Sequence, residues 1–368
     1  MIRRTFLAST AAALAALSFA AAGAAHAQER VVNVYNWSDY IDESILEAFT
    51  QETGIRVVYD VFDSNELLET KLLAGGSGYD VVVPTASFLA RQIQAGVFQK
   101  LDKSKLPNIS NMWDVVSERV AKYDPGNEYS VNYMWGTTGI GYNTAKVKEA
   151  LGVDRIDSWS AVFDPANMEK LAACGVYMLD SPTDVLPSVF VYLGIDPNTT
   201  NPDDFAKAEE AMLKVRPFVR KFHSSEFINA LANGDICVAV GFSGDLFQAR
   251  DRAAEAGAGV EIAYSIPKEG AQMWFDQMAI PADASHVDEA HEFLNYMMRP
   301  DVIAKASNYV FYANGNLASQ ELLNPEVRND PAIYPDEATL QKLFTVQPYD
   351  SRTQRVVTRT WTRIVTGQ

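Results

Sequence analysis

The chain has 368 residues, and its 47 acidic residues outnumber its 31 lysines and arginines, which gives a formal net charge of −16 at pH 7. This acidic excess disfavours partners such as nucleic acid and anionic membranes, and it is compatible with a cationic ligand. Net charge also serves solubility, so it selects no particular site. The length exceeds that of one ordinary domain and suits two domains of about 150 residues each.

The first 27 residues have the pattern of an export signal. Arg3 and Arg4 precede a run of Ala, Leu and Phe, and Ala25-His26-Ala27 has the small-x-small pattern of a signal peptidase site. We expect cleavage after Ala27 and a mature protein in the periplasm. A membrane anchor is disfavoured because the apolar run is short and weakly hydrophobic. The paired arginines leave both the general and the twin-arginine export routes open.

Strands and helices alternate after this segment. The pattern predicts a strand over 31–37, a helix over 43–53, a strand over 55–62, a helix over 65–76 and a strand over 79–85. Gly54 should end the first helix, and Asp63, with Glu66 three residues later, should cap the second. This βαβαβ order is typical of a mostly parallel sheet with helices on both faces.

Polar and aromatic side chains follow two of these strands. Trp37, Ser38 and Tyr40 come after the first strand, and Thr85 and Ser87 come after the third. In such sheets ligands bind beyond the carboxyl ends of the strands, so these two groups should meet at one rim.

A second lobe is predicted to begin near the glycine-rich segment 133–147. Its strands over 175–180 and 237–242 also lead into acidic groups, with Asp184 after one and Asp245 after the other. We therefore expect a second polar rim that faces the first.

Two further strands flank a Lys-Glu-Gly turn in the segment 261–284. The second of them carries Trp274 and Asp276. An aspartate in an apolar strand is costly unless it is paired or solvated, so Asp276 is a candidate site residue.

The sequence thus predicts a two-lobed α/β protein without a low-complexity linker. We assign residues 28–136 and 260–304 to an N-terminal lobe, and residues 137–259 and 305–368 to a C-terminal lobe. Strand crossings between the lobes should act as hinges.

Cys174 and Cys237 are the only cysteines in the chain. Two cysteines in an exported protein usually pair, so we expect one disulfide. Each cysteine opens an apolar run that is typical of a buried strand, and neighbouring strands would bring them together. Two buried free thiols are the alternative.

The expected strand ends combine aromatic side chains with carboxylates, and the same short segments contain no basic residue. A tryptophan face attracts an ammonium by about 0.5–2 kcal/mol. A carboxylate at about 4 Å adds roughly 4 kcal/mol at an effective dielectric near 20. Each aromatic alone is better explained by core packing, but together they indicate a site for an amine.

Several long segments carry a family resemblance: NWSDYID, DVVVPTASFLARQIQAGVFQKLDKSKLP, YMWGTTGIGYN, FHSSEFINALANGDICVAVGFSGD, YSIPKEGA and RPDVIAKASNYVFYANGN. They resemble the periplasmic polyamine-binding proteins of bacterial ABC importers, especially the putrescine-binding type. The resemblance implies a two-lobed periplasmic binding protein of type II that closes on putrescine or spermidine. It further implies a monomer that delivers the polyamine to an inner-membrane ABC permease, with no enzymatic activity, cofactor or metal.

The resemblance also implies the ligand contacts. Those of the N-terminal lobe would be Trp37, Ser38, Asp39, Tyr40, Thr85, Ser87, Trp274 and Asp276. Those of the C-terminal lobe would be Asp184, Phe242, Asp245 and Tyr312. The putrescine type has serine, glutamate, tryptophan and phenylalanine where this chain has Thr85, Asp184, Phe242 and Trp274. The physiological polyamine is therefore left open.

Other functions fit the residues less well. Ser243 lacks the glycine spacing of a nucleophile elbow, and His286 and His291 are five apart, which misses the spacing of a helical zinc pair. We expect a strand-end serine and a solvated helix start instead. The same fold could bind agmatine, cadaverine, an amino acid or ferric iron. An amino acid would require an arginine or a helix N-terminus for its carboxylate.

Overall fold

The computed structural model describes residues 30–257 and 259–368, and the predicted signal sequence lies outside them. In this part of the chain eleven strands form one connected sheet, whose main path runs β2-β1-β3-β9-β4-β7-β5-β6. The strands are β1 (Val31–Trp37), β2 (Arg56–Phe62), β3 (Val81–Val82), β4 (Ser130–Asn143), β5 (Val176–Met178), β6 (Val219–Phe222), β7 (Val238–Phe242), β8 (Ile262–Ser265), β9 (Ala271–Ala279), β10 (Ala313–Asn314) and β11 (Leu343–Phe344).

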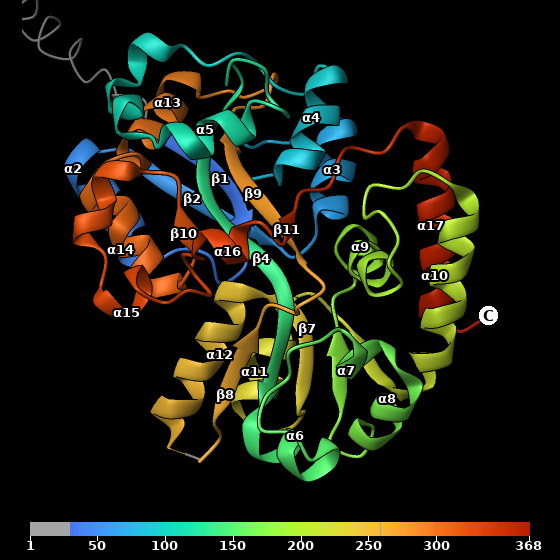
Figure 1. The fold of residues 1–368 in the computed structure, drawn as a ribbon. Helices are drawn as coiled ribbons and strands as arrows, with labels where there is room; N and C mark the ends of the chain where they lie inside the picture. Colours follow the sequence, from blue (N-terminus) through green and yellow to red (C-terminus); the bar gives the residue numbers. More distant parts are fainter. Residues whose placement is uncertain (1–29, 258) are drawn as a thin grey trace, which may run out of the picture.

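One long strand, β4, joins the two lobes (Figure 1). Its first part, up to Thr137, pairs antiparallel with β9, and the next residues, from Thr138, pair antiparallel with β7. Just before this change of partner, a Cβ at Gly136 would lie 2.8 Å from the Trp274 ring and 2.9 Å from Ser243 Oγ. Only glycine fits so close an approach, which explains one of the glycines in this segment.

The first lobe is built on the parallel pairs β1–β2 and β1–β3. The helices around it are α2 (Glu43–Thr53), α3 (Asn65–Leu73), α4 (Ala86–Gln94), η1 (Lys103–Lys105), η2 (Pro107–Asn111), α5 (Asp114–Val120), α13 (Val287–Met297), α14 (Pro300–Val310), η4 (Leu317–Leu322), α15 (Pro325–Arg328) and α16 (Glu337–Leu340). Gly54 ends α2 in the left-handed conformation, with φ 71°. The predicted cap of α3 at Asp63 is wrong, because the hydroxyl of Ser64 accepts the backbone N–H of Leu67 at 3.2 Å.

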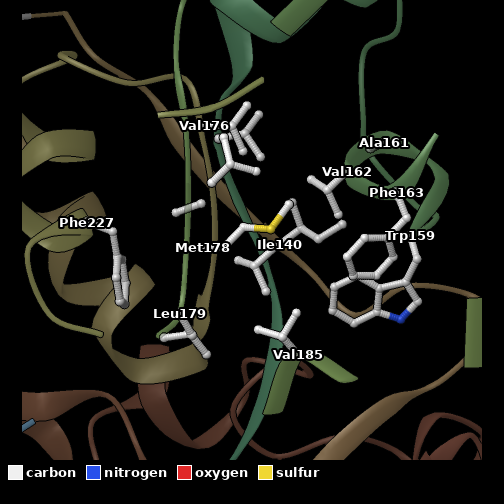
Figure 2. Close-up of a cluster of buried hydrophobic side chains, with 14 of the residues drawn as sticks. Ile140, Trp159, Ala161, Val162, Phe163, Val176, Met178, Leu179, Val185 and Phe227 are labelled. Atoms are coloured by element: carbon white, nitrogen blue, oxygen red, sulfur yellow. The ribbon is translucent and has the colours of Figure 1, made fainter. Parts of the chain in front are cut away.

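The second lobe is built on the parallel pairs β5–β6 and β5–β7. Its helices are α6 (Thr144–Leu151), α7 (Ser160–Phe163), α8 (Pro165–Leu171), α9 (Pro182–Tyr192), α10 (Pro202–Val215), η3 (Arg216–Phe218), α11 (Phe227–Ala232), α12 (Ser243–Ala256) and the C-terminal α17 (Ser351–Thr366), which lies beside α10 (Figure 1). Figure 2 shows the core, in which Trp159 and Phe163 pack near Met178 and Val185.

The predicted disulfide between Cys174 and Cys237 is confirmed, with 5.4 Å between the two Cα atoms. Cys174 lies just before β5 and Cys237 just before β7, and these strands are parallel neighbours in register. The bond therefore ties the starts of two adjacent strands of the second lobe.

Two segments pack in the lobe opposite to the one expected. β8 pairs with residues 140–143 of β4 and so belongs to the second lobe. The end of α14 packs with the core around β1, β10 pairs with β4 at Trp135, and residues 323–340 pack with helices α4 and α5, so residues 305–340 belong to the first lobe. The reason is that the chain crosses between the lobes after β8 and again after β11, where no break in the sequence pattern marks the crossing. For the remaining residues, the division into lobes stays a prediction.

Candidate functional site

One cavity lies between the two lobes, beyond the carboxyl ends of β1, β3 and β7. Its lining comprises Trp37, Ser38, Tyr40, Asp63, Asn65, Thr85, Ser87, Phe88, Thr183, Asp184, Ser224, Phe242, Asp245, Gln272, Trp274, Asp276 and Tyr312. Every expected contact residue except Asp39 is in this set.

Asp276 enters the cavity from β9 and is held by two hydroxyl groups of the first lobe. Its Oδ1 accepts a hydrogen bond from Thr85 Oγ1 at 2.7 Å, and its Oδ2 accepts one from Tyr40 Oη at 2.9 Å. Asn65 fixes Thr85, because it donates to Thr85 Oγ1 at 2.9 Å and accepts the Thr85 backbone N–H at 3.1 Å. Burial raises the pKa of Asp276 to about 7, against the opposing effect of the two hydroxyl donors.

Asp245 lies in the first turn of α12, where the helix dipole favours a carboxylate. Its Oδ1 accepts a hydrogen bond from Tyr312 Oη at 2.7 Å, and its backbone N–H donates to the same hydroxyl at 3.1 Å. Burial raises the pKa of Asp245 to about 7, although the hydrogen bond from Tyr312 lowers it.

The contact between Asp245 and Tyr312 joins the lobes. Tyr312 follows α14 and packs in the core around β1, so its expected place in the C-terminal lobe is wrong. The cause is the apolar face of α14, which docks on the first lobe and carries β10 to the edge of β4.

Asp184 lies in the first turn of α9 and is held within the second lobe. Its Oδ2 accepts a hydrogen bond from Ser181 Oγ at 2.6 Å, and its Oδ1 accepts one from Thr138 Oγ1 at 3.1 Å. Burial raises the pKa of Asp184 to about 6, while both hydroxyl groups lower it.

These three carboxylates have no cationic neighbour in the cavity. Of the described side chains that line it, none is a lysine, an arginine or a histidine. The charge of Asp184 raises the pKa of Asp276 in addition to the effect of burial, and that of Asp276 does the same to Asp245. An uncompensated buried carboxylate is costly, so the site is built to receive positive charge.

Aromatic rings form the rest of the wall. Phe242 lies between Trp37 and Trp274, with ring centroids 6.3 and 5.5 Å away, and both contacts are edge to face. Tyr312 lies 5.4 Å from Trp274 and 5.0 Å from Tyr40. Such faces pack against methylene groups and attract an ammonium. The cavity measures about 40 Å³. This volume holds about three water-sized spheres, so the cavity suits a thin, linear ligand.

Asp39 does not line the cavity. It adopts a left-handed conformation, with φ 54°, and its Oδ1 accepts a hydrogen bond from Arg252 Nη2 at 2.6 Å. The turn after β1 thus directs Ser38 and Tyr40 inward and Asp39 toward α12. The side chain of Asp39 makes an ion pair with the second lobe, away from the cavity.

The sequence reasoning missed six of the lining residues: Asp63, Asn65, Phe88, Thr183, Ser224 and Gln272. Asp63 and Asn65 follow β2, which is parallel to β1, so the rule that placed Trp37 at the rim would have found them. Ser224 follows β6 in the same way, whereas Phe88 and Thr183 lie in the first turns of helices α4 and α9. Gln272 lies on the crossing strand β9, and no sequence signal separates it from a core position.

Comparison with known proteins identifies the family. The profile described as "Bacterial extracellular solute-binding protein" matches residues 44–335. The chain is 54% identical to the putrescine-binding periplasmic protein SpuD of Pseudomonas aeruginosa, over 96% of each chain. It is 53% identical to the putrescine-binding periplasmic protein PotF of Escherichia coli, also over 96% of each chain.

The chain belongs to the bacterial extracellular solute-binding proteins. A solved structure of a spermidine/putrescine ABC transporter protein from Listeria monocytogenes is similar, with a TM-score of 0.81 and 33% identity over 92% of this chain and all of that one. The expected type II fold is therefore confirmed, and so is a role in solute binding rather than catalysis.

The residues weighed for catalysis have structural contacts. Ser243 begins α12, and its Oγ accepts the backbone N–H of Thr137 at 3.3 Å. His286 precedes α13 with Nδ1 3.0 Å from Asp80 Oδ2. The solvated position expected for His291 is wrong, because it is buried and its Nε2 accepts the backbone N–H of Asp102 at 2.9 Å.

The described residues contain neither a membrane-spanning helix nor a cluster of metal ligands. In residues 30–257 and 259–368, no helix has the length and apolar character needed to cross a membrane. The side chains of the same residues form no group of three or more His, Cys, Asp or Glu suited to a metal ion.

Proposed function

We propose that this protein captures a linear polyamine between its two lobes and delivers it to an inner-membrane ABC permease. The observation that carries the proposal is the set of three buried carboxylates, Asp184, Asp245 and Asp276, in a cavity whose described lining has no basic side chain. The names of the relatives, which are putrescine-binding and periplasmic, support the same ligand class.

Each ammonium group of the polyamine would bind next to a carboxylate that hydrogen bonds from neighbouring hydroxyl groups already hold in place. Asp276, with its donors Tyr40 and Thr85, would hold one end from the first lobe. Asp184 and Asp245 would hold charge from the second lobe. Trp37, Phe242 and Trp274 would pack on the methylene groups between the charges, where Ser38, Ser87 and Tyr312 complete the wall.

The proposed mechanism is a population shift between open and closed lobes. The ligand contacts carboxylates of both lobes only when the lobes are closed, so binding favours the closed state by this difference in contacts. β4 crosses between the lobes and would act as a hinge. The permease would then recognise the closed form.

The proposal includes the cellular setting. The protein would be exported, cleaved after Ala27, and act in the periplasm as a monomer without cofactor, metal or nucleic acid.

Other solutes are disfavoured by the chemistry of the lining. The carboxylate of an amino acid would meet Asp184, Asp245 and Asp276, because the N-termini of α9 and α12 at the cavity already carry two of these acids and the described lining has no arginine. Ferric iron would require clustered tyrosines and an anion site. Cadaverine and agmatine carry the same kind of charge as putrescine, so they remain alternatives within the proposed class.

The test has two parts. Mass spectrometry of small molecules released from the purified, denatured protein should identify a di- or triamine. Calorimetry should then give tight binding of putrescine or spermidine and none of glutamate or glycine. Binding of the amino acids, with no response to any amine, would refute the proposed function.

A further inference from the structure

A second cavity of about 350 Å³ adjoins the cavity described above, which we call the inner cavity. We call the second one the outer acidic cavity, and its lining comprises Asp63, Ser64, Glu66, Leu67, Thr70, Asp180, His223 and Ser224. Asp63 and Ser224 line both cavities. The first lobe supplies the start of α3 and the second lobe supplies the residues after β5 and β6, so the outer acidic cavity also lies between the lobes.

The charge of this cavity is negative. Asp63, Glu66 and Asp180 face it, and the only basic side chain in its described lining is His223. The Nδ1 atom of His223 accepts the backbone N–H groups of Ser225 and Glu226, each at 3.2 Å. The Nε2 atom of His223 lies 3.3 Å from Oε1 of Glu226, so both ring nitrogens are engaged within the segment 223–226 and the imidazole contacts none of the three carboxylates.

Arg91, the cation that acts on Glu66, is already paired with Glu69. Arg91 lowers the pKa of Glu66 from a distance, but its guanidinium makes two hydrogen bonds to Glu69, at 2.5 and 2.6 Å. Burial raises the pKa of Glu66 to about 7, and the charge of Asp184 in the inner cavity adds to the effect. The outer carboxylates are therefore electrostatically coupled to the proposed binding site.

Two residues that line this cavity each have a buried oxygen atom without a hydrogen-bond partner among the described residues. One is Oγ of Ser224, a residue only 8% exposed, and the other is Oε1 of Glu66. Buried polar atoms are nearly always paired in folded proteins, so each of these atoms has an unused capacity to bind a ligand. Both accept hydrogen bonds, as an ammonium requires.

We propose that the outer acidic cavity binds the distal ammonium of a triamine such as spermidine, while the rest of the triamine occupies the inner cavity. The inference rests on the proposed polyamine function and adds a claim about the length of polyamine that the protein accepts. The inner cavity is small, and its wall at Asp63 and Ser224 is shared with the outer one, so a longer chain has a continuous path between carboxylates. The described side chains form no metal cluster there, which favours an organic cation.

The experiment compares putrescine with spermidine by calorimetry, in the full mature chain and in three variants. Glu66→Gln and Asp180→Asn each remove one outer charge while keeping the shape of the side chain, and neither residue lines the inner cavity. Glu149→Gln, on the exposed face of α6, changes net charge equally but lies outside both cavities. We expect the outer variants to weaken spermidine about tenfold and putrescine less than about twofold. The control should change neither.

The outcomes separate the two claims. Equal losses for both amines, or no loss for either, would overturn the outer subsite and leave the proposed function in place. A wild-type protein that binds neither amine overturns both. If MgCl₂ at constant ionic strength raises the Tm of the putrescine-loaded protein, and Glu66→Gln abolishes this rise, the cavity binds an inorganic cation and the triamine assignment is wrong.

Discussion

The two lobes present their carboxylates to the cavity in different ways. The first lobe uses Asp276 in the middle of a strand, where hydroxyl groups of Tyr40 and Thr85, from distant parts of the chain, hold both oxygen atoms. The second lobe uses Asp184 and Asp245 in the first turns of two helices, where the helix dipole favours negative charge, and Thr138 and Tyr312 also donate to them from distant parts of the chain. The first wall, at Asp276, therefore depends on long-range packing alone, whereas the second wall, at Asp184 and Asp245, combines such contacts with helix starts that the local sequence specifies.

The second wall also has a covalent support that is absent from the described part of the first. We predict that replacing Cys174 and Cys237 by serine lowers the free energy of unfolding by about 4 kcal/mol, because the bond closes a long loop in the unfolded chain. The two residues are 63 positions apart. Urea unfolding measures the loss.

The putrescine affinity of this double variant should change less than about twofold, since neither cysteine lines the cavity. Two thiols that alkylate readily in protein purified from the periplasm would contradict the assignment, as would an unchanged unfolding midpoint.

Of the substitutions in the cavity, removal of the Asp276 charge should reduce the putrescine affinity the most. Asp276→Asn should weaken putrescine by at least about 2 kcal/mol, because the ammonium loses a buried charged partner. The stability of the empty protein should not fall, since a buried carboxylate without a cation is itself costly. Calorimetry and thermal unfolding of the same sample measure both effects.

Asp245→Asn is the matched variant in the second wall, and we expect a loss of similar size there. Unchanged affinity in both variants would refute the assignment of these carboxylates to the ligand.

Sequence reasoning predicted the parts of the site that depend on local patterns. Strand ends and long family segments placed Trp37, Thr85 and Asp276 together, and the cavity contains all three. It failed where the outcome depends on tertiary packing. The inward or outward direction of Asp39 is decided by a left-handed turn and an ion pair with Arg252.

The lobe to which Tyr312 belongs was unpredictable for a similar reason. α14 has an apolar face that would suit a core of either lobe, and only the docking of that face places β10 beside β4. The fold class, by contrast, follows from the βαβ order, which is a local property of the chain.

Both walls should respond to pH in the same direction. The pKa values of Asp245 and Asp276 are raised to about 7, and that of Asp184 to about 6. An aspartate with a raised pKa takes up a proton on folding, so its favourable contribution to stability is present at low pH and is lost as the pH rises toward 7. The empty protein should therefore lose this contribution between about pH 4 and pH 7.

Putrescine binding should show the opposite trend, because the ammonium groups require ionised carboxylates. Affinity should rise about tenfold per pH unit for each carboxylate that must ionise, and then level off above about pH 7. Calorimetry between pH 5 and pH 8 in buffers of equal ionic strength tests this. In Asp245→Asn the rise should be shallower, and a flat profile in the wild type would contradict the burial of these charges.

The hydroxyl groups that hold the two walls should contribute less. Tyr312→Phe removes the hydrogen bond to Asp245 that joins the lobes, and Tyr40→Phe removes one to Asp276 within the first lobe. Each should weaken putrescine by about 1 kcal/mol. Only Tyr312→Phe should also make the closed state less populated, which small-angle scattering of the loaded protein would show as a larger radius of gyration. Equal radii for both variants would remove the distinction.

The smallest effect concerns ligand length and the aromatic wall of the first lobe. Trp274 offers a large face, and its ring packs so tightly at Gly136 that a Cβ there would lie 2.8 Å away. Phe242, which replaces a larger ring of the putrescine type, frees space on the opposite side. We predict that putrescine and spermidine both bind, with affinities within about 2 kcal/mol, or roughly thirtyfold. Trp274→Phe should then shift the ratio toward putrescine by about threefold, because the smaller ring loses contact with the middle nitrogen of the triamine. Calorimetry with both amines decides it, and a preference above about a hundredfold for either amine in the wild type would mean that one wall alone sets the length.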